Sequence, residues 1–295
     1  MRTDGDQWDI TSSVGATALG VAAGRAVESQ KDRPLVEDPY AQAFVDDAGM
    51  DVALPGTPSA QEDTDEMWSI MSTYMGVRTR FFDEFFADAT TVGVRQVVLL
   101  AAGLDARAFR LPWPDGVTVY EIDQEAVLRF KDEVLEAHDA TATVDRVAVT
   151  ADLRDDWPAA LRAAGFDAGA PTAWLAEGLL PYLPPEAETL LFERVQELSV
   201  PGSRIAVEHF AEVASLFSDD PRFARMRKML GVDIGDLVYT DPRDRTPEAH
   251  LAELGWKTLR VSVRDLAVAY RRPLDEELAA TMGEVSLMSA ERLAD

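Results

Sequence analysis

The chain has 295 residues, of which 47% are hydrophobic and 27% charged, a composition typical of a folded globular protein. It contains no cysteine, which excludes disulfides, thiolate nucleophiles and cysteine-ligated metal sites. With 28 basic and 53 acidic residues the formal net charge is −25, so nucleic acid and anionic membranes are unfavourable partners.

The N-terminus does not resemble a targeting segment. Its first ten residues contain three aspartates and no apolar run, whereas a signal peptide combines basic residues with an apolar region. No apolar stretch of the sequence approaches the roughly 20 residues that a membrane span requires. Together with the absence of cysteine, these features favour a cytoplasmic location.

The first third of the chain is expected to be helical. Helices are predicted over residues 14–30, 39–48 and 66–90, and the Pro-, Gly- and acid-rich segment 54–63 is typical of a loop. In the long helix, Met67, Trp68, Met71 and Met75 follow helical spacing. We interpret this stripe as packing between helices rather than as a substrate site.

From residue 94 onward, short apolar runs alternate with helical segments. Strands are predicted over 96–101, 117–122, 145–150, 172–176 and 203–208, with helices over 125–138, 157–164 and 185–198. The continuous apolar run 96–101 is typical of a strand buried on both faces. This alternation predicts an α/β fold with a mostly parallel sheet and right-handed crossovers.

The alternation stops after the fifth strand. Residues 210–245 are charged and predicted to be helical, followed by a helix over 248–254 and strands over 255–262 and 283–289. We therefore expect an N-terminal helical lid (1–93), an α/β core (94–209), a helical lid insertion (210–247) and a C-terminal part of the core (248–295). The lids would cover the carboxyl edge of the sheet, where open α/β sheets bind ligands.

The first two strands end in residues suited to a nucleoside. Gly103 follows the first strand, where a glycine lets the backbone approach a ligand closely, although the dinucleotide fingerprint G-x-G-x-x-G is absent. The second strand ends at Asp123, with Glu121 on the same face, and an acid at this place can accept two hydrogen bonds from a ribose diol. A solvated strand end or a helix cap would explain either acid equally well.

The next two strands also end in acids. Asp152 could accept from an adenine amino group while Leu153 packs on the ring, or it could cap the following helix. Glu177 stands at the tip of the fourth strand, where it could receive an ammonium group or simply be solvated. An acidic rim along one sheet edge suits a nucleoside that carries a positive charge, and S-adenosylmethionine is such a molecule.

Six motifs in order resemble the leucine carboxyl methyltransferase-like family of S-adenosylmethionine-dependent methyltransferases, in particular its actinobacterial branch. They are Asp38-Pro-Tyr-Ala41, Arg78-Thr-Arg-Phe-Phe-Asp83, Ala102-Gly-Leu-Asp-Ala-Arg107, Tyr120-Glu-Ile-Asp123, Asp152-Leu-Arg154 and Glu177-Gly-Leu-Leu-Pro-Tyr-Leu183. The resemblance covers residues 14–256. It implies a class I methyltransferase (Rossmann-like) fold with helices on both faces of the sheet.

The resemblance also implies roles for single residues toward the cofactor. Arg78 would meet its carboxylate, Gly103 would lie under its methionine portion, and Glu177 would lie near its amino group. Asp123 would bind the ribose, and Asp152 with Leu153 the adenine. Arg25 is similar to a basic residue from the N-terminal helix, at a longer spacing from Asp38. The alternative for Arg78 is an ion pair with Asp83 or Glu84.

The methyl acceptor is expected to be a small molecule that offers an oxygen atom. Methyl transfer is an in-line displacement that depends mainly on positioning, and a carboxylate acceptor needs no base, whereas a hydroxyl does. The only histidines are His138, His209 and His250. His209 follows the fifth strand and is the first candidate for a base, and Tyr182 is the second candidate for lining the acceptor pocket.

The sequence also allows other hypotheses for the function. The chain could bind S-adenosylmethionine without catalysis or, less favourably, act as a nicotinamide-dependent oxidoreductase, which the missing glycine fingerprint argues against. Arg222, Arg225, Arg243 and Arg245 could recruit an anionic substrate, but we favour their pairing with the protein's own carboxylates. The family's substrate, a C-terminal leucine on a phosphatase, is not transferred to this chain.

Overall fold

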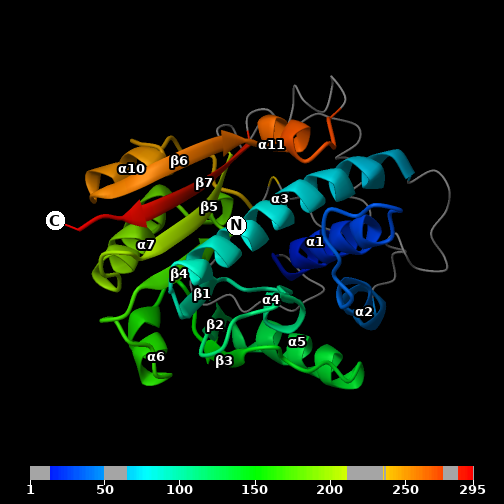
Figure 1. Ribbon diagram of the computed structural model, residues 1–295, viewed down its shortest axis with the longest axis horizontal. Helices are drawn as coiled ribbons and strands as arrows, with labels where there is room; N and C mark the ends of the chain where they lie inside the picture. Colours follow the sequence, from blue (N-terminus) through cyan, green and yellow to red (C-terminus); the bar gives the residue numbers. More distant parts are fainter. Residues whose placement is uncertain (1–13, 50–64, 211–234, 236, 275–284, 295) are drawn as a thin grey trace.

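A seven-stranded sheet in the order β3-β2-β1-β4-β5-β7-β6 forms the centre of the protein. The structure is a computed structural model that describes residues 14–49, 65–210, 235, 237–274 and 285–294 (Figure 1). The strands are β1 (Gln96–Leu100), β2 (Thr118–Asp123), β3 (Asp145–Thr150), β4 (Thr172–Ala176), β5 (Arg204–Phe210), β6 (Trp256–Ser262) and β7 (Val285–Arg292).

The first five strands run parallel, and β7 lies antiparallel between β5 and β6. In the register, Leu99 on β1 stands opposite Glu121 on β2 and Leu175 on β4. The carboxyl ends of these strands therefore meet at one edge. Because the strand order reverses between β1 and β4, this edge is where open α/β sheets form a ligand crevice.

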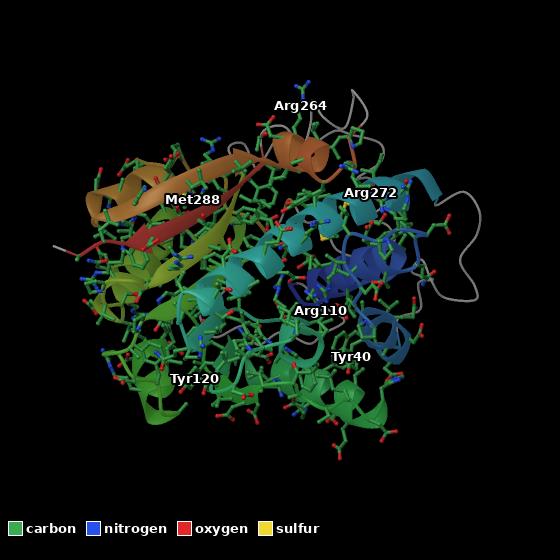
Figure 2. The ribbon with its side chains drawn as sticks, viewed as in Figure 1. Tyr40, Arg110, Tyr120, Arg264, Arg272 and Met288 are labelled. Carbon is green, nitrogen blue, oxygen red and sulfur yellow. The ribbon has the colours of Figure 1, made fainter. Side chains whose placement is uncertain are left out.

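Helices cover both faces of the sheet because successive strand side chains point to opposite faces. One face packs against α1 (Val14–Ser29), α3 (Asp65–Thr91), α5 (Glu125–Ala137) and α11 (Val263–Ala269). The other packs against α6 (Trp157–Ala163), α7 (Pro185–Glu197) and α10 (Pro247–Glu253). Tyr120 on β2 and Met288 on β7, labelled in Figure 2, belong to the second core.

The N-terminal helices lie against the sheet next to its carboxyl edge. The long helix α3 crosses the face of the sheet, with α1 beside it and α2 (Ala41–Asp47) next to α1 (Figure 1). Close packing of α1 on α3 requires a glycine at position 24, since a Cβ atom there would lie 2.7 Å from Cγ of Met75. This packing brings α1 and α3 next to the crevice.

Most predicted elements are confirmed, with small shifts of their ends. Within the described segments, the sequence does not predict three short elements: α4 (Arg107–Arg110), η2 (Leu180–Tyr182) and α11. The last strand runs from Val285 to Arg292 and is longer than expected, because it pairs along its length with both β5 and β6. Among the described residues, none of the helices combines the length and apolar character that a membrane span requires.

The helical prediction for residues 210–245 is wrong for its described C-terminal part. Residues 237–245 form turns, bends and irregular backbone. The reason is that this segment bonds to the loop after β4 rather than to itself: the Tyr239 N–H donates to the carbonyl of Pro181 over 2.8 Å. Residues 211–234, with Arg222 and Arg225, lie outside the described part of the chain, and the proposed division into lids and core stays a prediction.

Candidate cofactor and acceptor site

A cavity of about 460 Å³ opens at the carboxyl edge of the sheet, where the strand order reverses. Its walls come from α1, α3, the turns that follow β1 to β4, the end of β5 and residues 238–239. A volume of this size falls within the roughly 300–1,000 Å³ of small-molecule sites.

The cavity gathers every residue that the sequence assigned to the cofactor, from five separate elements. They are Arg78, Gly103, Asp123, Asp152, Leu153 and Glu177, together with Arg25 and Tyr182. Because the carboxyl ends of the parallel strands meet at one edge and α1 and α3 lie beside it, residues as far apart in the chain as Arg25 and Tyr182 line one cavity.

The carboxylate of Asp123 at the end of β2 accepts two hydrogen bonds from backbone N–H groups, one of them in the turn after β1. Gly103 has φ +50°, and its N–H donates to Oδ2 of Asp123 over 2.7 Å. The Gln124 N–H donates to Oδ1 over 2.7 Å. Burial raises the pKa of Asp123 and these two N–H groups oppose that rise. A carboxylate has about four acceptor positions, so Asp123 can still accept from hydroxyl groups in the cavity.

Asp152 and Leu153 form the wall below the end of β3. Asp152 accepts from the N–H and Nε of Arg154, each over 2.9 Å. Burial raises the pKa of Asp152, but these bonds outweigh it and lower the pKa. The helix α6 is capped by Asp156, whose Oδ1 accepts from the Ala159 N–H over 3.3 Å. The helix-cap explanation for Asp152 is therefore wrong.

Arg78 is buried between two carboxylates. Its Nη2 lies 2.8 Å from Oε2 of Glu208, and its Nε lies 3.3 Å from Oε1 of Glu177. Burial lowers the pKa of Arg78, but Glu208 and Glu177 more than compensate and raise it. The alternative pairing with Asp83 or Glu84 is not observed, because Asp83 pairs with Arg107 and Arg110, and Glu84 with Arg80.

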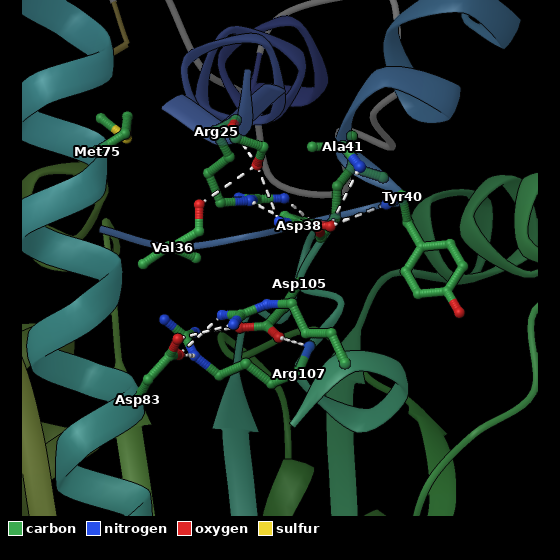
Figure 3. Close-up of polar contacts among 12 residues, drawn as sticks. Arg25, Val36, Asp38, Tyr40, Ala41, Met75, Asp83, Asp105 and Arg107 are labelled. Atoms are coloured by element: carbon green, nitrogen blue, oxygen red, sulfur yellow. Dashed lines mark hydrogen bonds and ion pairs between the residues drawn. The ribbon is translucent and has the colours of Figure 1, made fainter. Parts of the chain in front are cut away.

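Arg107 connects this site to α3 (Figure 3). Its Nη1 lies 2.7 Å from Oε2 of Glu177, and its Nε lies 2.7 Å from Oδ1 of Asp83. It also pairs with Asp105, whose carboxylate accepts from the Arg107 N–H over 2.7 Å. Burial raises the pKa of Asp105, but Arg107 dominates and lowers it to about 2.

Sequence reasoning missed Tyr74, Arg107 and Glu208 as site residues. Tyr74 and Glu208 line the cavity, and the Tyr74 hydroxyl donates to Oε1 of Glu208. The period-two alternation of β5 could have identified Glu208, because it shares a face with Ala206 at the carboxyl end of the strand. The packing interpretation of the methionine stripe is incomplete, since Met71 and Met75 also line the cavity.

His209 does not belong to the cavity. It follows Glu208 on β5 and so points to the opposite face, and the described lining residues include no histidine. Burial lowers its pKa to about 4, with Arg260 and Arg243 adding to the effect. His138 pairs with Asp47, and His250 packs against Phe192. The expectation of His209 as the base thus has no support from its position.

The two described arginines of the expected lid insertion pair with the protein's own acids. Nε of Arg243 lies 2.6 Å from Oε2 of Glu188, and Arg243 also donates to the carbonyls of Leu180 and Leu183, each over 3.1 Å. Arg245 pairs with Glu253. This agrees with the favoured interpretation, in which these arginines balance carboxylates rather than recruit a substrate.

The sequence profile of the family described as leucine carboxyl methyltransferase matches residues 18–196. The chain belongs to the leucine carboxyl methyltransferase family. A relative from Rhodococcus jostii is 53% identical over 290 residues, 94% of this chain and 95% of its own. One from Mycobacterium avium is 46% identical over 316 residues, 99% of both chains. Both are named "Putative S-adenosyl-L-methionine-dependent methyltransferase".

The fold agrees with this family. A crystal structure of a "putative methyltransferase" from Thermobifida fusca aligns with a TM-score of 0.52 at 18% identity, over 93% of this chain and 94% of that one. At this identity the likeness shows the class I methyltransferase fold alone. The expected family, enzyme class and cofactor, S-adenosylmethionine, are confirmed. Cofactor binding without catalysis and nicotinamide chemistry are not favoured.

The cavity of the methyltransferase fits the charged groups of S-adenosylmethionine. Nε of Arg78 is buried and lies 3.3 Å from Oε1 of Glu177, but it forms no hydrogen bond with a described residue. Within the described part of the chain, its Nη1 donates to the thioether sulfur of Met75 over 3.3 Å, and sulfur is a weak acceptor. Arg78 therefore keeps donors for a carboxylate, and Glu177 and Asp123 offer acceptors for an ammonium group and hydroxyls.

Proposed function

We propose that the methyltransferase binds S-adenosylmethionine across these strand ends and methylates an oxygen atom of a small acceptor in the same cavity. One observation carries the proposal: a single cavity joins the acidic strand ends to an apolar wall. That wall is formed by side chains of α1, α3, the end of β5 and the segment after it, namely Val21, Met71, Met75, Phe210 and Val238.

The residues have distinct roles toward the bound cofactor. Asp123 would accept from the ribose hydroxyls, Asp152 from the adenine amino group beside Leu153, and Gly103 would allow close approach. Arg78 would hold the carboxylate, and Glu177 the ammonium group. When bound, S-adenosylmethionine supplies an electrophilic methyl group on a sulfonium. The protein contributes orientation and exclusion of water.

An oxygen acceptor is consistent with the groups that line the cavity. The described lining residues provide no histidine to take a proton, and the carboxylates of Glu177 and Glu208 are both held by arginines. An acceptor whose oxygen already carries negative charge, such as a carboxylate, needs no such base. Its apolar part would pack against Met71, Met75 and Phe210. We place this reaction in the cytoplasm, in keeping with the cysteine-free, acidic chain.

Calorimetric titration with S-adenosylmethionine, S-adenosylhomocysteine and NAD tests cofactor binding. We expect both adenosyl ligands to bind, NAD to be silent, and Asp123→Ala to weaken adenosyl binding at least tenfold. Asp132→Ala is the matched control, because Asp132 is an acid of α5 whose side chain is 48% exposed and pairs with Arg146 away from the cavity. Equal binding by both variants would remove the cavity as the cofactor site.

Radiolabelled methyl transfer tests the acceptor. The purified protein is incubated with labelled S-adenosylmethionine and a panel of small apolar carboxylic acids, phenols and amines. Methyl esters lose their label in mild base, whereas methyl ethers and methylamines keep it. Base-labile product from the carboxylic acids supports a carboxylate acceptor. Label transferred only to amines would contradict an oxygen acceptor.

A further inference from the structure

A connected cluster of seven charged side chains lies beside the cavity. It runs from the end of β5 through the turn after β4 to α4 and α3, and consists of Glu208, Arg78, Glu177, Arg107, Asp105, Asp83 and Arg110. Among the described residues, four carboxylates of the cluster face three guanidinium groups, which leaves one negative charge in excess. Every side chain of the cluster is at most 16% exposed. Charges this deeply buried are costly unless each is paired, so the cluster suits a further cationic partner.

Glu208 forms the end of the cluster and is held on both oxygens. Oε2 accepts from the Gly178 N–H over 2.7 Å and lies 2.8 Å from Nη2 of Arg78. Oε1 accepts from the Tyr74 hydroxyl. The Glu208 side chain is only 1% exposed, so its orientation is fixed by these three groups.

Gly178 leaves room for this arrangement. Its φ is +62°, and a Cβ atom there would lie 2.7 Å from Nη2 of Arg78 and 3.7 Å from Oε2 of Glu208. A side chain at this position would be strained at this φ and would require Nη2 of Arg78, which pairs with Glu208, to shift. The glycine of the Glu177-Gly178 sequence therefore makes room for a contact between α3 and β5.

The position of Glu208 determines which donors Arg78 has left. Glu208 holds Nη2, Glu177 lies 3.3 Å from Nε without a hydrogen bond to it, and Nη1 is directed to the weakly accepting sulfur of Met75, so Nε and Nη1 remain for a ligand. Without the Glu208 charge, Arg78 would be free to pair with Glu177 alone as a bidentate fork. That pairing would occupy the Arg78 N–H groups that we assign to the ligand carboxylate. It would also occupy the Glu177 carboxylate that we assign to the ligand ammonium group.

We propose that Glu208, held by Tyr74 and Gly178, is a positioning residue that orients Arg78 for the amino acid portion of the cofactor. This inference rests on the proposed function, because it assumes that S-adenosylmethionine binds in this cavity. It predicts that Glu208 matters for ligands with an amino acid portion and not for the bare nucleoside part. A purely structural role would affect both kinds of ligand alike.

Calorimetry with S-adenosylhomocysteine and 5′-methylthioadenosine tests the proposal, because the second ligand lacks the amino acid portion. We expect Glu208→Gln to weaken S-adenosylhomocysteine at least tenfold and to change 5′-methylthioadenosine less than twofold. In an Arg78→Gln background, Glu208→Gln should cause little additional loss, since its effect passes through Arg78. Tyr74→Phe removes one hydrogen bond to Glu208 but keeps the ion pair between Glu208 and Arg78. It should weaken S-adenosylhomocysteine more than 5′-methylthioadenosine, with a smaller loss of affinity than Glu208→Gln. This variant replaces Glu208→Gln in the test if Glu208→Gln does not fold.

Glu188→Gln is the matched control. Glu188 is also a buried acid paired with an arginine, Arg243 at 2.6 Å, but it does not line the cavity, so its substitution should leave both affinities unchanged. Equal weakening of the two ligands by Glu208→Gln, or no weakening of either, would overturn the positioning role. Loss of neither ligand in Asp123→Ala, or no binding to the unaltered protein, would instead overturn the proposed function.

Discussion

Neighbouring residues on β5 have opposite environments. Glu208 faces the cavity, where Arg78, Tyr74 and the Gly178 N–H satisfy its carboxylate. His209 faces the other core, where burial and nearby arginines keep its ring neutral. Because side chains alternate along a strand, Glu208 contributes to the cavity and His209 to the core on the opposite face of the sheet.

His209 should make stability depend on pH. Its pKa is about 4 in the folded protein against an ordinary value of 6.5. Between these values the unfolded chain binds more protons, so the free energy of unfolding falls as pH drops from 6.5 toward 4. The effect is on the order of 3 kcal/mol or less. Urea unfolding at pH 7 and pH 5 should show a smaller loss for His209→Gln than for the unaltered protein. Equal losses would contradict this.

At the scale of elements, buried polar contacts fix the N-terminal helices against the crevice. Nε of Arg25 on α1 lies 2.8 Å from Oδ2 of Asp38, and its Nη2 donates to the Leu104 carbonyl over 2.6 Å (Figure 3). Oδ1 of Asp38 accepts from the Tyr40 and Ala41 N–H groups, each over 3.1 Å, at the start of α2. One buried ion pair therefore joins α1, α2 and the turn after β1.

Removal of this ion pair should cost considerable stability. Arg25→Ala leaves Asp38 buried without its cation, and such a loss costs about 3–5 kcal/mol. Arg80→Ala is the control, since Arg80 and Glu84 form an exposed pair on α3, worth less than about 1 kcal/mol. Chemical denaturation of both variants measures the difference. A similar small loss in both would show that the Arg25 pair is not stabilising.

The turn after β1 depends on Gly103. Gly103→Ala places a side chain at φ +50°, which costs roughly 1–2 kcal/mol, and adds a methyl group to the cavity wall. Gly49→Ala is the control, because Gly49 has φ +61° with no atom within 4 Å of a Cβ at that position. Both should lose similar stability, but only Gly103→Ala should weaken S-adenosylhomocysteine in calorimetry. Unchanged affinity would argue against close approach of the cofactor.

At the scale of the whole molecule, negative charge dominates. The formal net charge is −25, so acidic side chains of the folded protein repel one another. Salt screens this repulsion over a Debye length of about 10 Å at 0.1 M. The buried pairs around Arg78 and Arg107 are screened much less. Stability should therefore respond to salt mainly through the acidic surface.

Raising NaCl from 10 to 150 mM should increase the melting temperature. Sucrose at equal osmolality is the control, because it does not screen charge. Calorimetric scans at pH 7.5 measure the shift. A fall in melting temperature with NaCl would mean that surface ion pairs outweigh the net repulsion.

Local patterns predicted most strands and helices because each element's signal lies within its own residues. The run 96–101 and the segment 172–176 are apolar enough to identify strands buried on both faces. The segment 237–245 was mispredicted because its backbone bonds to Pro181 and the loop after β4, and no local pattern encodes a partner so distant in the chain.

The sequence by itself determined the family and the parallel strands whose carboxyl ends carry Gly103, Asp123, Asp152 and Glu177, the residues we propose for the cofactor. Parallel strands bring such ends together whatever their distance in the chain. Only the tertiary structure decided which groups hold Arg78 and that His209 faces away from the cavity. Ion-pair partners such as Glu208 and Tyr74 are chosen by packing between α3 and β5, which local sequence does not record.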